Sequence, residues 1–95
     1  MKKLDLEEIA SRVPHLAGWS VDQEKLFREF NFADFPRAFR FMSSVAIVCQ
    51  EMNHHPEWTN VYTNLKVWLS SHEVDGISDR DFELAERMNA LFAPR

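Results

Sequence analysis

The sequence predicts an α+β fold, a four-stranded antiparallel sheet with three helices packed on one face, in the order α-β-β-α-β-β-α. Three observations support this fold class. Apolar residues recur at helical spacing in three segments, two pairs of short strand-like segments lie between them, and no glycine-, serine- or proline-rich linker divides the chain. With 95 residues, the chain is too short for two domains, so we expect residues 1–95 to form one.

The first helix is expected at residues 5–13, where Leu6, Ile9 and Val13 recur at helical spacing and Pro14 stops the helix. Acidic residues at its beginning favour the helix N-terminus. Residues 19–22 and 25–32 then read as two strands of a hairpin with a short polar turn between them.

A long helix is expected between Asp34, a good N-cap, and Asn53, near which the helix should end before Pro56. Phe41 and Val48 lie off its main apolar stripe. They can serve a second partner, such as another subunit, or form the wide edge of one core face, and spacing alone leaves both interpretations open. The main stripe consists of Phe35, Ala38, Phe39, Met42, Val45, Ala46, Cys49 and Met52.

The second hairpin is expected at residues 58–62 and 65–71, with a turn at 63–64. Leu65, Val67 and Leu69 alternate with Lys66, Trp68 and Ser70, which is the period of a half-buried strand. If the alternation continues, His72 belongs to the face of Trp68 and stays out of the core. After a loop at 73–77, Ser78 and Asp81 form a capping-box pattern, and the last helix runs to about residue 92.

Composition limits the function. Eleven basic and fifteen acidic residues give a net charge of −4 without a basic cluster, so we expect no direct contact with nucleic acid. The N-terminus has no apolar run of signal-peptide or membrane length, and we expect a cytoplasmic protein. The single cysteine, Cys49, falls on the apolar stripe and is expected in the core. A small domain without disulfides often completes its core by association, so we expect a homodimer or homotetramer.

The chemistry of the chain is concentrated at His54, His55 and Pro56, with His72 further along. Histidine titrates near neutrality, so a cluster can supply both a proton donor and an acceptor, as an elimination of water requires. The simpler interpretation of His-His-Pro is a polar turn. Three imidazoles can also hold a zinc ion. However, adjacent His54 and His55 converge on one ion only with a strongly bent backbone, and we predict no metal.

These residues belong to an ordered set that resembles the pterin-4a-carbinolamine dehydratase family. The resemblance runs from Ala17 to about Ala85. One position departs from it, since Gln50 stands where the family usually has a charged residue, four residues before His54. The matching residues are Gly18, Trp19, Asp34, Phe35, Arg37, Ala38, Phe39, His54, His55, Pro56, Glu57, Trp58, Asn60, Val61, Tyr62, Ser71, His72, Gly76 and Asp81.

The resemblance implies a lyase that converts 4a-hydroxytetrahydropterin to quinonoid dihydropterin without a cofactor, and so recycles the pterin of an aromatic amino-acid hydroxylase. It implies that the three histidines are catalytic, with His54 and His72 as acid and base and His55 orienting the pterin. Trp19 and Pro56 would contact the substrate, whereas Asp81 is interpreted as a helix cap. The alternative is a non-catalytic binding or assembly module of the same fold that acts through protein contacts.

Overall fold

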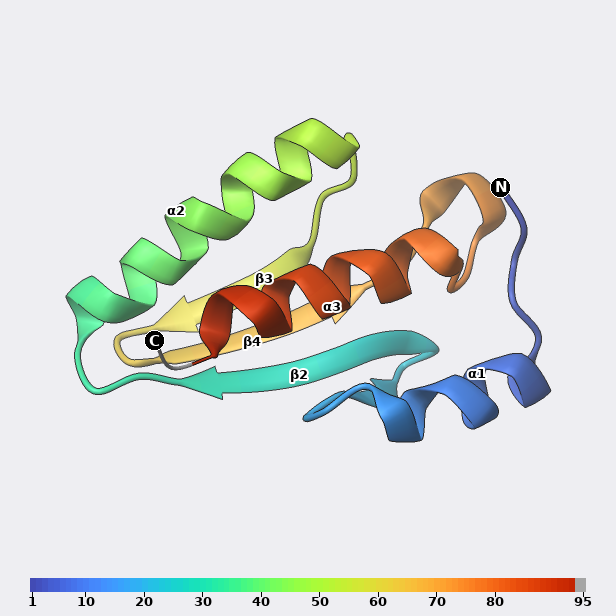
Figure 1. Cartoon of the computed structure of the whole chain (residues 1–95), viewed down its shortest axis with the longest axis horizontal. Coiled ribbons are helices and arrows are strands. Elements are labelled where there is room, and N and C mark those ends of the chain that lie inside the picture. Colours follow the sequence, from blue (N-terminus) through green and yellow to red (C-terminus); the bar gives the residue numbers. More distant parts are fainter. Residues whose placement is uncertain (94–95) are drawn as a thin grey trace.

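The computed structural model describes residues 1–93 and confirms the predicted α+β fold and order of elements. Four strands form one antiparallel sheet in the order β1-β2-β4-β3. Two longer helices, α2 and α3, lie across one face of the sheet, and the short α1 lies beside the β1–β2 end (Figure 1). The elements are α1 (Leu6–Arg12), β1 (Ser20–Asp22), β2 (Lys25–Asn31), α2 (Phe35–Met52), β3 (Glu57–Val61), β4 (Asn64–Leu69) and α3 (Asp79–Phe92), with 3-10 turns at Val13–His15 and His72–Val74.

The alternation predicted for β4 is confirmed. Leu65, Val67 and Leu69 are completely buried under the helices, and β2 contributes Leu26 and Phe30 to the same core. Register explains this, because Leu26 pairs with Leu69 and Phe30 with Leu65, so the apolar side chains of both central strands point to one face. The opposite face of the sheet is left to Phe27, Lys66 and Trp68, among others.

The first hairpin turns at Gln23 and Glu24, as expected, and both residues have positive φ, 52° and 62°. The second hairpin is shifted by one residue from the prediction. Its turn lies at Tyr62-Thr63, because Val61 pairs with Asn64 as the last register pair. Asn60 holds this turn, since its side-chain amide donates to the carbonyl groups of Tyr62 and Asn64.

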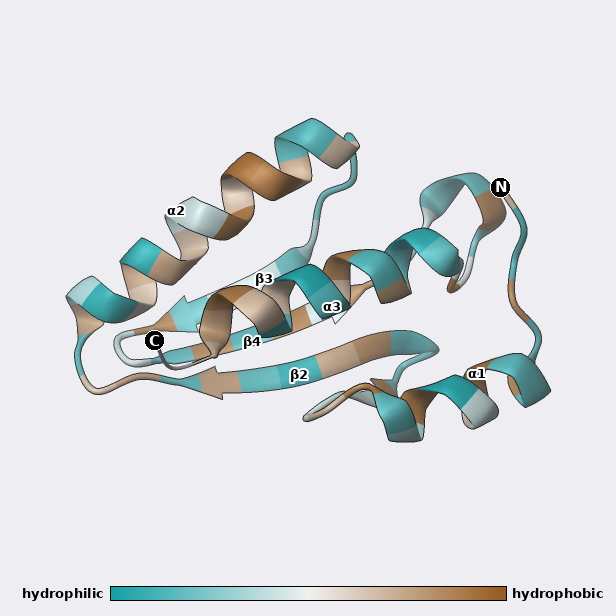
Figure 2. Cartoon of the chain, viewed as in Figure 1, coloured by the Kyte–Doolittle hydropathy of each residue, from teal (hydrophilic) through white to brown (hydrophobic). Residues whose placement is uncertain are grey.

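The prediction of which face of α2 meets the core is partly wrong. Phe41 and Val48, which lie off the predicted stripe, are buried, whereas Phe35 and Phe39 of that stripe are 40% and 56% exposed. Ile47, which the stripe did not include, is 64% exposed. The helix is rolled so that the ring of Phe41 reaches the aromatic cluster between sheet and helices, where Phe30, Phe32 and Phe92 lie 4.9, 5.3 and 5.9 Å from its centroid. Figure 2 shows a strongly hydrophobic turn in the second half of α2 and a hydrophilic segment after the helix.

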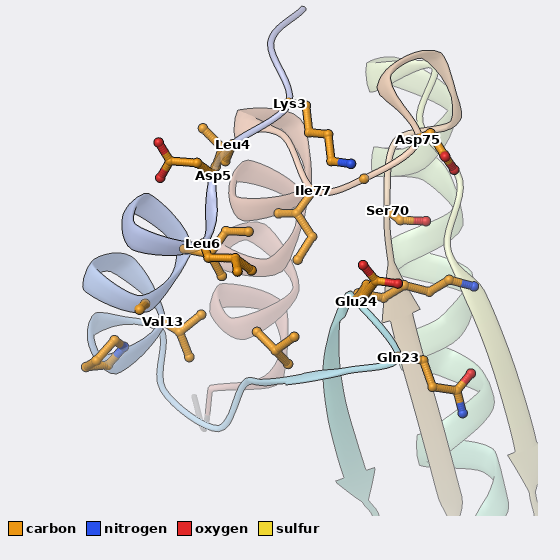
Figure 3. Close-up of a pocket in the computed structure, with 16 residues that line it drawn as sticks. Lys3, Leu4, Asp5, Leu6, Val13, Gln23, Glu24, Ser70, Asp75 and Ile77 are labelled. Carbon is orange, nitrogen blue, oxygen red and sulfur yellow. The ribbon is translucent and has the colours of Figure 1, made fainter.

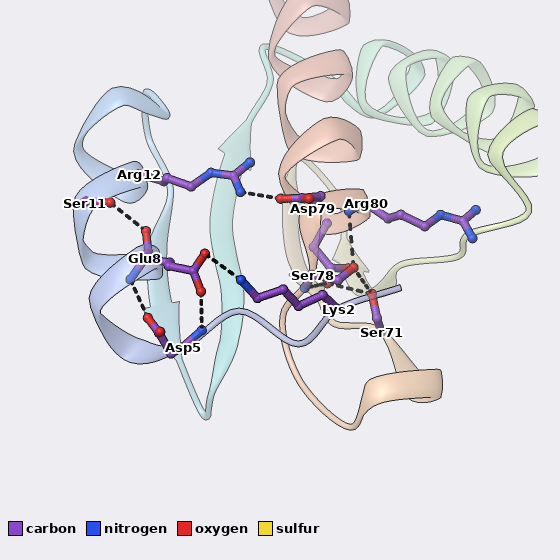
Figure 4. A network of polar contacts seen from close by, with 10 residues as sticks. Lys2, Asp5, Glu8, Ser11, Arg12, Ser71, Ser78, Asp79 and Arg80 are labelled. Carbon is purple, nitrogen blue, oxygen red and sulfur yellow. Dashed lines mark hydrogen bonds and ion pairs between the residues drawn. The ribbon is translucent and has the colours of Figure 1, made fainter.

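The helix ends agree with the capping signals. The Asp34 carboxylate accepts a hydrogen bond from the backbone of Arg37 at the start of α2. Ser78 and Asp81 form the predicted capping box of α3. An ion pair of 2.5 Å between Arg12 and Asp79 then ties α1 to the first turn of α3 (Figure 4). The N-terminus of α3 is therefore fixed both by its own capping box and by α1.

Candidate active site

The His-His-Pro corner forms where α2 ends. Asn53 takes the left-handed conformation, with φ 51° and ψ 46°, and the backbone N–H of His54 donates to the carbonyl of Cys49 at 3.0 Å. This closes the helix in the usual left-handed manner, and Pro56 keeps the following chain extended into β3. The two imidazoles therefore have different surroundings, because His54 is buried with 6% exposure and His55 is exposed.

His54 is held by Asp81, a completely buried carboxylate in the first turn of α3. Its Nε2 lies 2.6 Å from Asp81 Oδ1. The other oxygen, Oδ2, accepts from the hydroxyl of Ser71 and from the backbone N–H of Ser78, both at 2.9 Å. The two serine hydroxyls are 2.7 Å apart, and Figure 4 shows them meeting at the start of α3. The carboxylate thus has partners on both oxygens, and its position is over-determined.

The contact with Asp81 leaves the other ring nitrogen of His54 for chemistry. Within residues 1–93, no buried side-chain nitrogen or oxygen atom lacks a hydrogen-bond partner. Nε2 bonds Asp81, while Nδ1 makes no hydrogen bond in the same part of the chain, so Nδ1 is solvent-accessible. Since a carboxylate only accepts, Nε2 carries a proton and Nδ1 of the neutral ring holds the free lone pair.

The interpretation of Asp81 as only a helix cap is therefore incomplete. The same carboxylate closes the capping box and orients His54, 27 residues away in sequence. Nothing in the local spacing around either residue signals this contact. The only sequence signal was the place of Asp81 at the end of the ordered set of family residues.

A cavity of about 510 Å³ gathers four of the five predicted site residues, namely the three histidines and Pro56. His72 reaches it from the 3-10 turn after β4, where it is exposed and shares the cavity with Trp68 and Ser70. The parity expected for His72 is thus confirmed. The remaining lining residues are Lys25, Asn53, Glu57, Trp68, Ser70 and Glu73.

Trp19, the fifth predicted site residue, lies elsewhere. Its side chain is 5% exposed in the core, with the ring edge-on to Phe30 at 6.1 Å and Nε1 donating to Asn89 at 2.8 Å. The preceding Gly18 has φ 84°, and a Cβ there would lie 2.6 Å from the guanidinium carbon of Arg28. The Gly-Trp pair is explained by this close approach and by core packing. Trp19 is not among the residues that line the histidine cavity.

Two polar contacts border the cavity. Lys25 on β2 forms an ion pair with Glu57 on β3, with 2.7 Å between Nζ and Oε1. Trp68 on β4 donates its indole N–H to the carboxylate of Asp22 at 2.9 Å. Gln50, at the position that departs from the family pattern, is exposed on α2 and does not line the cavity.

A larger cavity of about 820 Å³ lies between α1, the β1–β2 turn and the segment around Ile77 (Figure 3). Its inner wall is apolar, from side chains such as Leu4, Ile9 and Val21, and no histidine or cysteine of the described residues 1–93 lines it. Proton transfer near neutrality needs groups that titrate there, so we place the candidate active site in the smaller cavity. The two cavities share Lys25 and Ser70 as a common wall.

Residues 1–93 contain no group of three or more histidine, cysteine or acidic side chains placed to hold a metal ion. Across the same residues, no helix combines the length and apolar character needed to cross a lipid bilayer.

Comparison with known proteins agrees with the resemblance in sequence. The profile of the family described as pterin 4 alpha carbinolamine dehydratase matches residues 2–91. A protein of Solibacter usitatus (strain Ellin6076), provisionally named as such a dehydratase, is 46% identical over 91 residues, covering 96% of each chain. A relative from Prochlorococcus marinus (strain MIT 9303) with the same provisional name is 44% identical over 88 residues, covering 93% of this chain and 92% of that one.

Solved structures give the same result. A crystal structure described as a transcriptional coactivator/pterin dehydratase from Brucella melitensis superposes with a TM-score of 0.93 at 36% identity, covering 97% of this chain and all of the other. A pterin dehydratase-like protein described as a RuBisCO assembly factor in the alpha-carboxysome shares the fold, with a TM-score of 0.67 at 19% identity over 81% of this chain and 89% of that one. The chain therefore belongs to the pterin-4a-carbinolamine dehydratase family.

Proposed function

We propose that this protein is a lyase that removes water from 4a-hydroxytetrahydropterin, such as 4a-hydroxytetrahydrobiopterin, to give quinonoid dihydropterin. The observation that carries the proposal is the His54–Asp81 contact at the wall of a cavity that two further histidines also line. A carboxylate that fixes the ring orientation of a histidine is a common way to prepare a base. The 510 Å³ cavity is within the size range of small-molecule sites.

The reaction breaks a carbon–oxygen bond and forms a carbon–nitrogen double bond, so one proton leaves a ring nitrogen and another reaches the departing hydroxyl. We assign the first transfer to Nδ1 of His54, since its Nε2–H stays bonded to Asp81. The imidazolium that results faces the carboxylate, which stabilises it. His72, which is exposed in the 3-10 turn after β4, delivers the second proton to the hydroxyl, which leaves as water. Solvent then restores both protonation states.

His55 and Pro56 complete the site in this proposal. His55 is exposed in the same cavity and orients the pterin through its ring nitrogens, while Pro56 touches the edge of the substrate. No cofactor takes part. The enzyme acts in the cytoplasm and recycles the pterin that an aromatic amino-acid hydroxylase has used.

The test is the rate of dehydration of chemically generated 4a-hydroxytetrahydropterin. We expect the wild type to accelerate it over the spontaneous reaction, and His54→Ala and His72→Ala each to lose about 100-fold or more of that acceleration. His15→Ala is the matched control, because His15 is exposed near α1 and does not line the cavity. A folded wild type without acceleration would refute the catalytic proposal.

A second, compatible proposal concerns protein contacts. The outer face of α2 exposes Phe35, Phe39 and Ile47. At the β3–β4 turn, Val61 and Tyr62 are 66% and 68% exposed beside the unpaired edge of β3. Apolar side chains grouped on one helix face of a small domain favour an interface, and we propose a homodimer or homotetramer built on it.

Light scattering after gel filtration tests the assembly. We expect Phe39→Glu to shift the protein to a smaller species, because it places a charge in the proposed interface. Ala90→Glu adds the same charge to an exposed position of α3 and should leave the mass unchanged. A monomeric wild type would refute the proposal. The exposed face of α2 would then be available for binding a different protein, as the binding-module alternative requires.

A further inference from the structure

We propose that Trp68 is the surface on which the flat ring of the pterin stacks. The inference rests on the proposed function and adds a substrate-binding residue to it. Trp19 cannot fill this role, since it is enclosed in the core. Apart from the three histidines, Trp68 is the one aromatic side chain among the cavity-lining residues within 1–93.

Register places Trp68 beside the catalytic groups. On β4 it pairs with Phe27 of β2 and with Glu57 of β3, and all three side chains lie on the sheet face away from α2 and α3. Glu57 directly follows the His-His-Pro corner, while Ser70 and His72 continue the parity of Trp68 toward the cavity. A ligand ring that stacks on Trp68 would therefore lie next to the three imidazoles of the same cavity.

The indole is held in place before any ligand arrives. Its Nε1 donates to Asp22, which lies on β1, two strands away, and the ring packs against Phe27 with centroids 5.1 Å apart and planes tilted by 41°. Trp68 is only half-buried, so part of the ring remains free. A preorganised ring loses little side-chain entropy when a ligand stacks on it.

The surroundings also suit the polar rim of a pterin. The Lys25–Glu57 ion pair stands at the border of the cavity, with Glu57 opposite Trp68 in the strand register. A heteroaromatic ring offers an apolar face and a rim of hydrogen-bonding groups. Here an aromatic surface and charged side chains lie together, as a site for such a ring requires.

The competing explanation is that Trp68 and Phe27 form a cross-strand pair that only stabilises the sheet. Binding and turnover separate the two. We expect Trp68→Leu to raise KM, and the Kd for 7,8-dihydropterin measured by titration calorimetry, by about 5- to 150-fold, the range of base–aromatic stacking. The value of kcat should change by less than about twofold, because Trp68 moves no proton. Trp68→Phe retains an aromatic face and should recover most of the affinity.

Trp58→Phe is the control, since Trp58 packs against the core and is not among the cavity residues. It should leave KM and Kd unchanged. Wild-type affinity in a folded Trp68→Leu, with the wild type active, would overturn the inference and leave the proposed function intact. A wild type that neither binds 7,8-dihydropterin nor accelerates dehydration would overturn both.

Discussion

Replacing Asp81 by asparagine tests the role assigned to His54, because it changes the charge of the side chain and almost nothing of its shape. The remaining carbonyl oxygen can take the position of Oδ2, which accepts from Ser71 and Ser78. The new amide group then faces His54 Nε2 at the present distance of 2.6 Å. An amide NH₂ only donates, so Nε2 must become the acceptor, and the proton of the neutral ring moves to Nδ1.

That proton occupies the lone pair that the reaction needs. Placing a catalytic histidine in the wrong tautomer removes its contribution as a base, so we expect kcat to fall by about 10²- to 10⁴-fold. The free energy of unfolding should fall by about 1–3 kcal/mol, since a buried charge-assisted hydrogen bond is replaced by a neutral one.

The assay measures the dehydration rate beside thermal unfolding, and ¹⁵N NMR of the imidazole reports the tautomer directly. Ser78→Ala is the matched control. It removes the capping hydroxyl that accepts from Arg80 and should cost about 1 kcal/mol of stability, but leaves the contact between Asp81 and His54. A folded Asp81→Asn variant with the wild-type rate would refute the reasoning.

Three further outcomes are expected. Burial raises the pKa of Cys49 from 9.0 to about 11, so the unfolded thiol ionises first, and stability that is present below pH 9 should be lost between pH 9 and 11. The free energy of unfolding should fall by about 3 kcal/mol in the wild type, and this fall should be absent from Cys49→Ala in denaturant titrations. The same pH dependence of stability in both proteins would contradict the prediction. Trp19→Phe removes the bond to Asn89 and should lower the free energy of unfolding by about 1–3 kcal/mol, with KM unchanged. A raised KM in this folded variant would return Trp19 to the site. Glu24→Gly places a glycine at a φ of 62° and should raise the free energy of unfolding by about 0.5–1 kcal/mol in the same titrations. An unchanged free energy of unfolding would show that the turn is not strained.

The α+β fold, the order of elements and most of the helix ends could be predicted because they depend on residues close together in the chain. Asp34 and Ser78 cap helices through backbone groups two or three residues away. The alternation of β4 follows from the two-residue period of a strand, which also identified the face shared by Trp68 and His72. The ordered set of histidines and Pro56 identified the corner that lines the cavity.

Tertiary structure decided the features that depend on contacts between distant residues. Helical spacing fits more than one rotation of α2, and the ring of Phe41 among its aromatic neighbours selected the one that exposes Phe39. Trp19 lies in the core, where its indole N–H donates to Asn89, 70 residues away in sequence. The contact of His54 with Asp81 spans 27 residues. No local propensity encodes such contacts, because they form only when the helices and sheet have packed and removed these side chains from water.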